Sequence, residues 1–175
     1  MAQFVAFSNN VEVNGETVLA VVDGSPIKSM ALQILEKNGI KNPAPGEWYP
    51  QQAWLDSFRE IAEKIGDGTL LVIGRAIPKN AQFPPDINSV EKALASIDVA
   101  YHMNHRKGDI GCYQYEKTGD KAAKMVCRNP YPCAFDRGII TTMAKAFAGG
   151  AVTKHDDTQP CRKNGADSCT YIVTW

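Results

Sequence analysis

The sequence predicts an α+β domain in which an antiparallel sheet of about four strands is covered by helices, with an N-terminal β-hairpin. Three observations predict this fold. Apolar residues recur at helical spacing up to about residue 107, and they alternate at strand spacing from residue 108 onward. The strand-like segments also come in pairs joined by short turns, which favours antiparallel neighbours. The 175 residues fit a single domain, with a hairpin and helical part at 1–107 and a sheet part at 108–175.

The N-terminal hairpin is predicted from an Asn-Gly pair between two β-forming runs. Asn14-Gly15 follows Val11–Val13 and precedes Glu16–Val22, and Asn-Gly is the strongest short signal for a two-residue hairpin turn. The first seven residues have no basic region, so a short strand is expected there and not a signal peptide.

Four helices are predicted around residues 27–37, 51–65, 89–101 and 135–147, with Ser89 as an N-cap. The second has an apolar stripe at Trp54, Phe58, Ile61 and Ile65, and the third at Val90, Leu94, Ile97 and Tyr101. Residues 69–77 fit either a strand or a helix, and 78–85 read as a loop. Strands are expected at 110–116, 122–128, 151–155 and 168–175.

Composition excludes several classes of protein. Lysine plus arginine and aspartate plus glutamate both number 19, so the chain lacks the basic excess of a nucleic-acid binder. No apolar run is long enough to cross a membrane. The five cysteines are an odd number without a signal sequence, which favours a reducing, cytoplasmic setting. Clustered cysteines there serve as buried apolar groups, metal ligands or redox thiols.

The most informative stretch is the C-terminal cysteine motif. Cys133 precedes an amphipathic helix, His155-Asp156-Asp157 ends a strand, and Cys161 and Cys169 flank a Gly-Ala-Asp turn before an alternating strand. The seven residues between Cys161 and Cys169 exceed the spacing of ordinary zinc fingers. Two alternatives stay open: the pair faces across a hairpin as small buried groups, or it belongs to a metal or redox site.

This ending resembles the C-terminus of 4-vinyl-reductase domains, whose superfamily also includes vesicle-tethering transport-particle subunits and heme nitric-oxide/oxygen-binding domains. The resemblance covers about residues 108–175. In aromatic-sensing regulators of this family, three cysteines and a glutamate bind zinc, and Cys133, Cys161 and Cys169 occupy the matching places. Thr158 replaces the glutamate, so His155, Asp156 or Asp157 would supply the fourth ligand.

The same superfamily implies heme as a second cofactor. Its heme-binding members carry the iron ligand on the helix before the sheet, where this chain has His102, and His105 is expected to lie beyond that helix in solvent. The propionate-binding Tyr-x-Ser-x-Arg motif is missing near Tyr113. An ordinary helix-terminal histidine, favoured by the helix dipole, is the alternative for His102.

A pocket for a small apolar or aromatic molecule is expected between helices and sheet, lined by Trp54, Phe58, Leu94, Tyr101 and Tyr131. Aromatic residues at helical spacing are, however, more typical of plain core packing. No nucleotide fingerprint or acid–base set is present, so a non-catalytic sensor or carrier is favoured over an enzyme. A heme-based gas or redox sensor and a reductase acting on a tetrapyrrole-like or hydrocarbon substrate are the alternatives. A homodimer and a separate signalling partner are expected.

Overall fold

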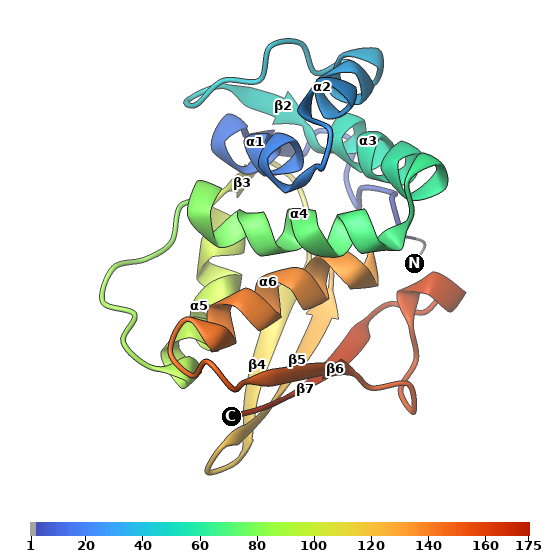
Figure 1. Ribbon diagram of the computed structural model, residues 1–175. Coiled ribbons are helices and arrows are strands. Elements are labelled where there is room, and N and C mark those ends of the chain that lie inside the picture. The colour runs from blue at the N-terminus through green and yellow to red at the C-terminus, as the bar shows by residue number, and fades with distance from the viewer. Residues whose placement is uncertain (1–2) are drawn as a thin grey trace.

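The computed structural model describes residues 3–175, and in it helices stack in layers above one antiparallel sheet (Figure 1). The main sheet has the order β4-β5-β7-β6, formed by Cys112–Gly119, Ala122–Arg128, Cys169–Thr174 and Val152–His155. A second, small sheet has the order β2-β1-β3, formed by Trp48–Pro50, Glu12–Asn14 and His105–Arg106. The predicted α+β class with an antiparallel sheet is therefore confirmed.

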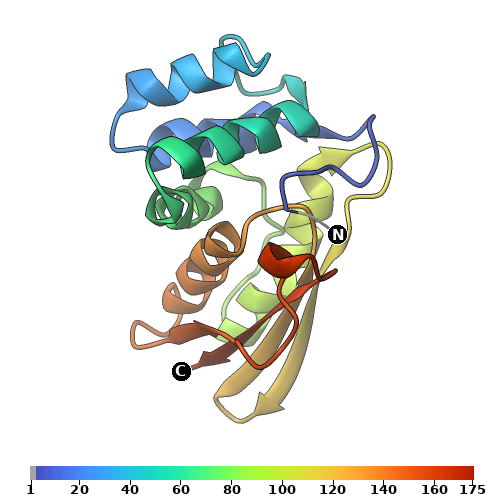
Figure 2. The ribbon, with the colours of Figure 1, turned by 90° about the vertical axis from the view of Figure 1, so that its right-hand side faces the viewer.

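Two helices cover the inner face of the main sheet. These are α5 (Val90–Met103), which packs on β4, and α6 (Cys133–Lys145), which packs on β6 and β7. Four more helices lie beyond them in Figure 2: α1 (Gly15–Gly24), α2 (Lys28–Lys37), α3 (Gln51–Lys64) and α4 (Asp67–Asn80). The sequence predicts that the helices carrying Trp54 and Leu94 both back the sheet. The Leu94 helix, α5, does so, but the Trp54 helix, α3, packs on α2 and α4 instead, so that part of the prediction is wrong.

The strands alternate as predicted, and their inward residues form the floor of the core. In β5 the residues Ala123, Met125 and Cys127 are fully buried, and they pair with Val173, Tyr171 and Cys169 of β7. Burying one face of each strand fixes the register, since a slip of one residue would turn every apolar side chain outward. This register places Cys169 at the end of the sheet that meets α6.

The N-terminal strand is confirmed, but its expected hairpin partner is a helix. Asn14 caps α1 by accepting a hydrogen bond from the backbone of Thr17 (3.0 Å), a role that asparagine fills as readily as a turn position. Gly15 is required there by close packing, because a Cβ atom would lie 1.8 Å from the carbonyl oxygen of Ala44. The strand β1 pairs instead with β2 and β3.

Two further expectations are corrected near the ends of elements. The ambiguous segment 69–77 lies in α4, which continues through Pro78 to Asn80, so the loop begins at residue 81. The described residues 3–10 form turns and bends, not a strand, and Met1 and Ala2 lie outside the described part of the chain. Within residues 3–175, no helix combines the length and apolar character needed to cross a membrane.

The helices α4 and α6 pack closely against each other at two glycines. A Cβ atom on Gly74 would lie 2.1 Å from the carbonyl oxygen of Phe135, and one on Gly138 would lie 2.3 Å from that of Leu71. Only glycine at both positions lets the two backbones touch. This contact fixes α6, and with it the cysteine at its first position, against the upper helices.

Candidate metal centre and adjoining cavity

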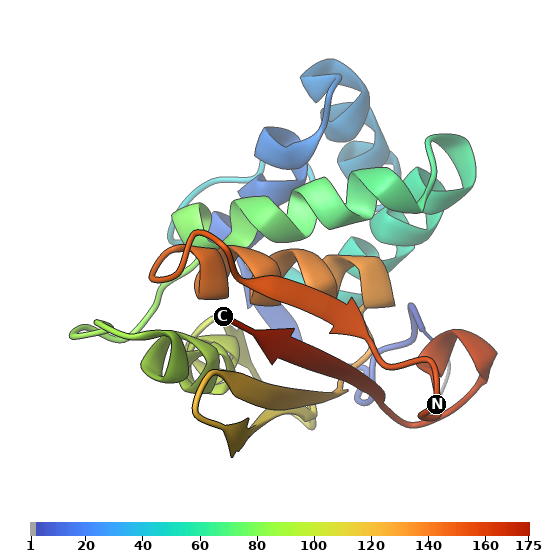
Figure 3. The ribbon, with the colours of Figure 1, turned by 60° about the horizontal axis from the view of Figure 1, so that its bottom comes forward.

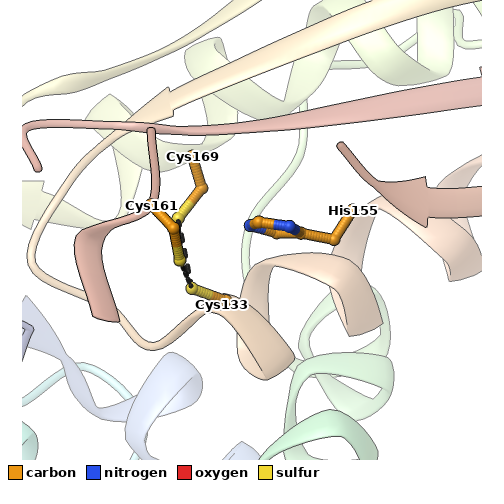
Figure 4. A group of neighbouring side chains, drawn as sticks. All are labelled: Cys133, His155, Cys161 and Cys169. Carbon is orange, nitrogen blue, oxygen red and sulfur yellow. Dashed lines mark hydrogen bonds between the residues drawn. The ribbon is translucent and has the colours of Figure 1, made fainter. Parts of the chain in front are cut away.

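Four side chains from four different elements converge at one end of the main sheet (Figure 4). Cys133 is the first residue of α6, His155 the last of β6 and Cys169 the first of β7, while Cys161 directly precedes the short helix η1 (Arg162–Asn164). The sulfur of Cys133 lies 3.4 Å from that of Cys161 and 3.1 Å from that of Cys169, and the last two are 3.7 Å apart. The three sulfurs therefore lie within about 4 Å of one another, a spacing that sulfur ligands of one zinc ion also have.

His155 is oriented to present one ring nitrogen to the sulfurs. Its Nδ1–H donates to the carboxylate of Asp157 (2.8 Å), which leaves Nε2 with a free lone pair. That Nε2 atom is buried without a hydrogen-bond partner, and it lies within 4.8 Å of each of the three sulfur atoms. A histidine held by a carboxylate on its outer nitrogen is the usual arrangement of a metal-binding imidazole.

The donor set and its spacing suit zinc. Three thiolates and one imidazole give a tetrahedral Cys₃His set, and a Zn–S bond of about 2.3 Å places sulfur atoms about 3.8 Å apart. The observed separations of 3.1–3.7 Å are slightly shorter than this value. All five cysteines are free, and Cys112 and Cys127 lie outside the cluster.

Arg162 forms the buried base of this cluster, and the sequence reasoning missed it. Its side chain is 2% exposed, and its backbone N and Nε donate to the sulfur of Cys169 at 3.3 and 3.4 Å. The guanidinium also forms an ion pair with Asp136 and donates to Asn129. The sequence signal was Asp136 itself, a charged residue on the otherwise apolar face of α6.

These contacts lower the pKa of the Cys169 thiol. The hydrogen bond from Cys133, followed by the charge of Arg162, lowers the pKa of Cys169 to about 3 despite the cost of burial. A lowered thiol pKa favours the thiolate, which is the form that binds metal.

An open hollow of about 300 Å³ leads from solvent to the cluster. Besides three of the four cluster residues, its lining includes Arg137, Asp157, Lys163 and Tyr171. Lys163 pairs with Asp67 of α4 at 3.0 Å. An ion could therefore reach the sulfurs without any opening of the core.

A separate, small cavity of about 30 Å³ lies between the sheet and the helices α1, α3, α4, α5 and α6. Three of the five expected pocket residues line it, namely Trp54, Tyr101 and Tyr131. Phe58 and Leu94 are buried in the core but do not line the cavity. Its place agrees with the expectation, but its size does not suit an aromatic or planar molecule, because this volume holds only one or two water-sized groups. The ring of Trp54 packs against Phe58, Tyr131 and Phe135 and fills the space.

His102, in the last turn of α5, and His105, just after that helix, have exchanged the places expected of them. The side chain of His102 is 53% exposed, and its Nδ1 contacts the backbone oxygen of Asp98. His105 is 7% exposed and lines the cavity. Its Nδ1–H donates to the backbone of Tyr101 (2.8 Å), and its Nε2 accepts from the hydroxyl of Tyr131 (2.6 Å). Burial lowers the pKa of His105 to about 4, so it is neutral at pH 7.

The cavity, in this conformation, does not fit a heme group. A porphyrin needs a pocket of several hundred Å³, and cofactor sites commonly span about 300–1,000 Å³. Among the described residues, the lining of the cavity contains no arginine or lysine that could hold a propionate. The lone pair of His105 that an iron would take is already occupied by Tyr131.

Comparison with solved structures shows an H-NOX-like fold, at low sequence identity. An H-NOX protein mutant from S. oneidensis in the Fe(II) ligation state is 14% identical with a TM-score of 0.66, covering 92% of this chain and 95% of its own. An H-NOX protein from the same organism in the Fe(II)NO state is 13% identical with a TM-score of 0.66, covering 91% and 97%. An Fe(II) unliganded H-NOX mutant from K. algicida is 12% identical with a TM-score of 0.65, covering 92% and 95%. Neither a family model nor a curated protein matches the chain.

Proposed function

We propose that this chain is a non-catalytic sensor domain with an H-NOX-like fold that binds zinc through Cys133, His155, Cys161 and Cys169. The single observation that carries the proposal is the buried Nε2 of His155, which has no hydrogen-bond partner and faces three thiols. A buried polar atom without a partner costs about 1–3 kcal/mol, and a bound ion removes that cost. The donor types and their spacing match a closed, structural zinc site.

Zinc in this position would link side chains from α6, from the paired strands β6 and β7, and from the loop between these strands. The cluster joins the start of α6, the end of edge strand β6, the loop before η1 and the start of β7. Because the ligands come from distant parts of the sequence, the free energy of metal binding adds to the free energy of folding. The ion would hold the C-terminal hairpin against α6 and the buried Arg162.

The sensor role is supported by the fold and by the small apolar cavity. The cavity suits a ligand of one or two heavy atoms, not the aromatic molecule that the sequence suggested. No acid–base set faces it apart from His105, whose two nitrogens are both bonded. A sensor in a reducing, cytoplasmic compartment, acting as a homodimer with a separate signalling partner, remains part of this proposal.

Heme binding is the second candidate, because several H-NOX neighbours are described by their iron state. In this chain His105 faces the cavity and His102 does not, so His105 would be the ligand. Two observations argue against heme: the tight aromatic packing around Trp54, and the lack of an arginine or lysine among the described lining residues that could bind a propionate. The 4-vinyl-reductase relationship and a reductase activity rest on the C-terminal cysteine motif alone.

One experiment separates these functions. The protein is purified without added metal or heme, and its zinc and iron contents and visible absorption spectrum are measured. We expect one zinc per chain and no Soret band. A preparation that contains heme and no zinc would replace this proposal with the heme sensor. A preparation that contains neither, folds normally and takes up no zinc on incubation would mean that the cluster is a set of buried thiols.

A further inference from the structure

A basic groove runs between α4, α6 and β6, on the side of α6 away from the sheet interior. It is defined by Arg75 of α4, Arg137, Thr141 and Lys145 of α6, and Thr153 of β6. Two adjoining hollows of about 250 and 460 Å³ share Arg75, Thr141 and Lys145, so they form one continuous feature. Figure 3 shows α4, α6 and β6 lying one after another along this side of the molecule.

The positive charges of this groove are not neutralised by the protein. No aspartate or glutamate is among the described residues that line either hollow. Within residues 3–175, Arg75, Arg137 and Lys145 also take part in no ion pair. This contrasts with Lys163 in the neighbouring hollow, which pairs with Asp67. In a chain of zero net charge, three unpaired cations around one groove are a local concentration of positive potential.

The two arginines project from the point where the helices touch. A Cβ atom on Gly138 would lie 2.9 Å from the backbone nitrogen of Arg75, so the two glycines bring the stems of Arg75 and Arg137 close together. Each arginine directly follows or precedes one of these glycines in the sequence. The close packing therefore fixes the backbone positions from which the two arginine side chains extend.

A buried hydroxyl at the β6 side adds a further hydrogen-bond donor. The Oγ1 atom of Thr153 is buried and has no hydrogen-bond partner. The hydroxyl of Thr141, by contrast, donates to the backbone of Arg137 at 2.6 Å. A buried hydroxyl without a hydrogen-bond partner costs free energy of folding. Thr153 can therefore donate to a ligand in the groove or to a water molecule bound beside it.

From this arrangement we propose that the groove binds a small phosphorylated molecule through its phosphate groups. Planar guanidinium groups bind phosphate oxygens in pairs, and a lysine adds a point charge. The groove is longer than one phosphate group, since it extends over two turns of α6 from Arg137 to Lys145, which favours two linked phosphates. The groove shares Arg137 with the hollow that leads to the zinc cluster, but none of the four cluster residues lines it, and it would give the domain a second ligand.

The test uses inorganic pyrophosphate as the probe, titrated into the zinc-loaded protein by isothermal calorimetry at low salt. We expect saturable binding that is at least tenfold tighter than that of inorganic phosphate and that weakens as salt rises. Arg75→Gln and Arg137→Gln should each weaken binding about tenfold or more, because each removes charge-assisted hydrogen bonds. Thr153→Val should weaken it by a smaller factor.

Lys92→Gln is the matched control, because Lys92 is an exposed lysine on α5 that takes no part in the groove. Its affinity for pyrophosphate should equal that of the wild type. All variants should keep their zinc and their melting temperature, since the substituted arginines are exposed. The proposal is overturned if pyrophosphate does not bind saturably, if Lys92→Gln loses as much affinity as Arg75→Gln, or if a glutamate-rich peptide binds more tightly than pyrophosphate.

Discussion

Arg162 donates two hydrogen bonds to a single sulfur atom, that of Cys169, from its backbone N at 3.3 Å and its Nε at 3.4 Å. The same guanidinium pairs with the buried carboxylate of Asp136. With zinc bound, three thiolates and one imidazole would leave the cluster with a net negative charge, which Arg162 partly offsets. The arginine therefore belongs both to the core and to the candidate metal centre.

Removing this arginine should destabilise the protein strongly. Arg162→Met leaves Asp136 buried without its charge partner, and breaking a buried ion pair from one side costs about 3–5 kcal/mol. The free energy of unfolding, measured in urea on zinc-loaded protein, should fall by that amount. The double variant Arg162→Met/Asp136→Leu should recover part of the loss. An unchanged urea midpoint in Arg162→Met would show that the ion pair contributes little.

Replacing one cysteine of the cluster should release the metal. Cys161→Ser removes one thiolate from a four-ligand site, so zinc content should fall from one per chain to a small fraction, and the melting temperature should fall with it. Cys112→Ser is the matched control, because Cys112 is a free cysteine outside the cluster. Equal zinc contents in the two variants would contradict the assignment of the ligands.

Titration with hemin should give no sharp Soret band, because the packed rings of Trp54 and its neighbours leave a cavity of only about 30 Å³. If a band does appear, the position of the two histidines predicts which variant removes it. The band should be lost in His105→Ala, whose side chain lines the cavity, and kept in His102→Ala, whose side chain is exposed. Loss in His102→Ala alone would restore the ligand expected from the sequence.

The buried histidine should make stability depend on pH. Burial lowers the pKa of His105 from 6.5 to about 4, so between these values the unfolded chain binds more protons than the folded one. The stabilisation from neutral His105 is thus complete above pH 6.5 and is lost as pH falls toward 4. At 1.36 kcal/mol per pKa unit the full loss is about 3 kcal/mol.

This effect is isolated by comparing wild type with His105→Gln in urea at pH 7 and pH 4.5. The loss of stability on acidification should be smaller in His105→Gln, while protonation of the zinc ligands affects both proteins alike. Parallel losses in the two proteins would mean that His105 does not control the pH response.

The glycine contact between α4 and α6 gives a matched pair of substitutions. Gly138→Ala would place a Cβ atom 2.3 Å from the carbonyl oxygen of Leu71, so the helices must separate. Overpacking of this kind costs about 1–3 kcal/mol. Gly68→Ala, at an open position in α4, should instead stabilise the protein by up to about 1 kcal/mol. Thermal melting of both variants measures the difference, and a stable Gly138→Ala would contradict the close contact.

Local patterns in the sequence determined most of the secondary structure. The stripe from Trp54 to Ile61, the cap at Ser89 and the alternation through Met125 each reflect burial of one face of an element, which leaves a periodic trace in the chain. Asn14-Gly15 misled because the same two residues begin either a hairpin or a helix, and only the pairing of β1 with β2 and β3 decides between them.

The resemblance of the C-terminal motif also implied that Cys133, Cys161 and Cys169 belong together, and it left His155, Asp156 and Asp157 as alternatives for a fourth ligand. Tertiary structure alone decided the rest of the site. The direction of the His155 ring, the burial of Arg162 and the exchange of His102 for His105 at the cavity depend on how distant segments pack against one another. Such contacts between residues far apart in the chain leave no periodic signal, because each is set by the three-dimensional meeting of two elements.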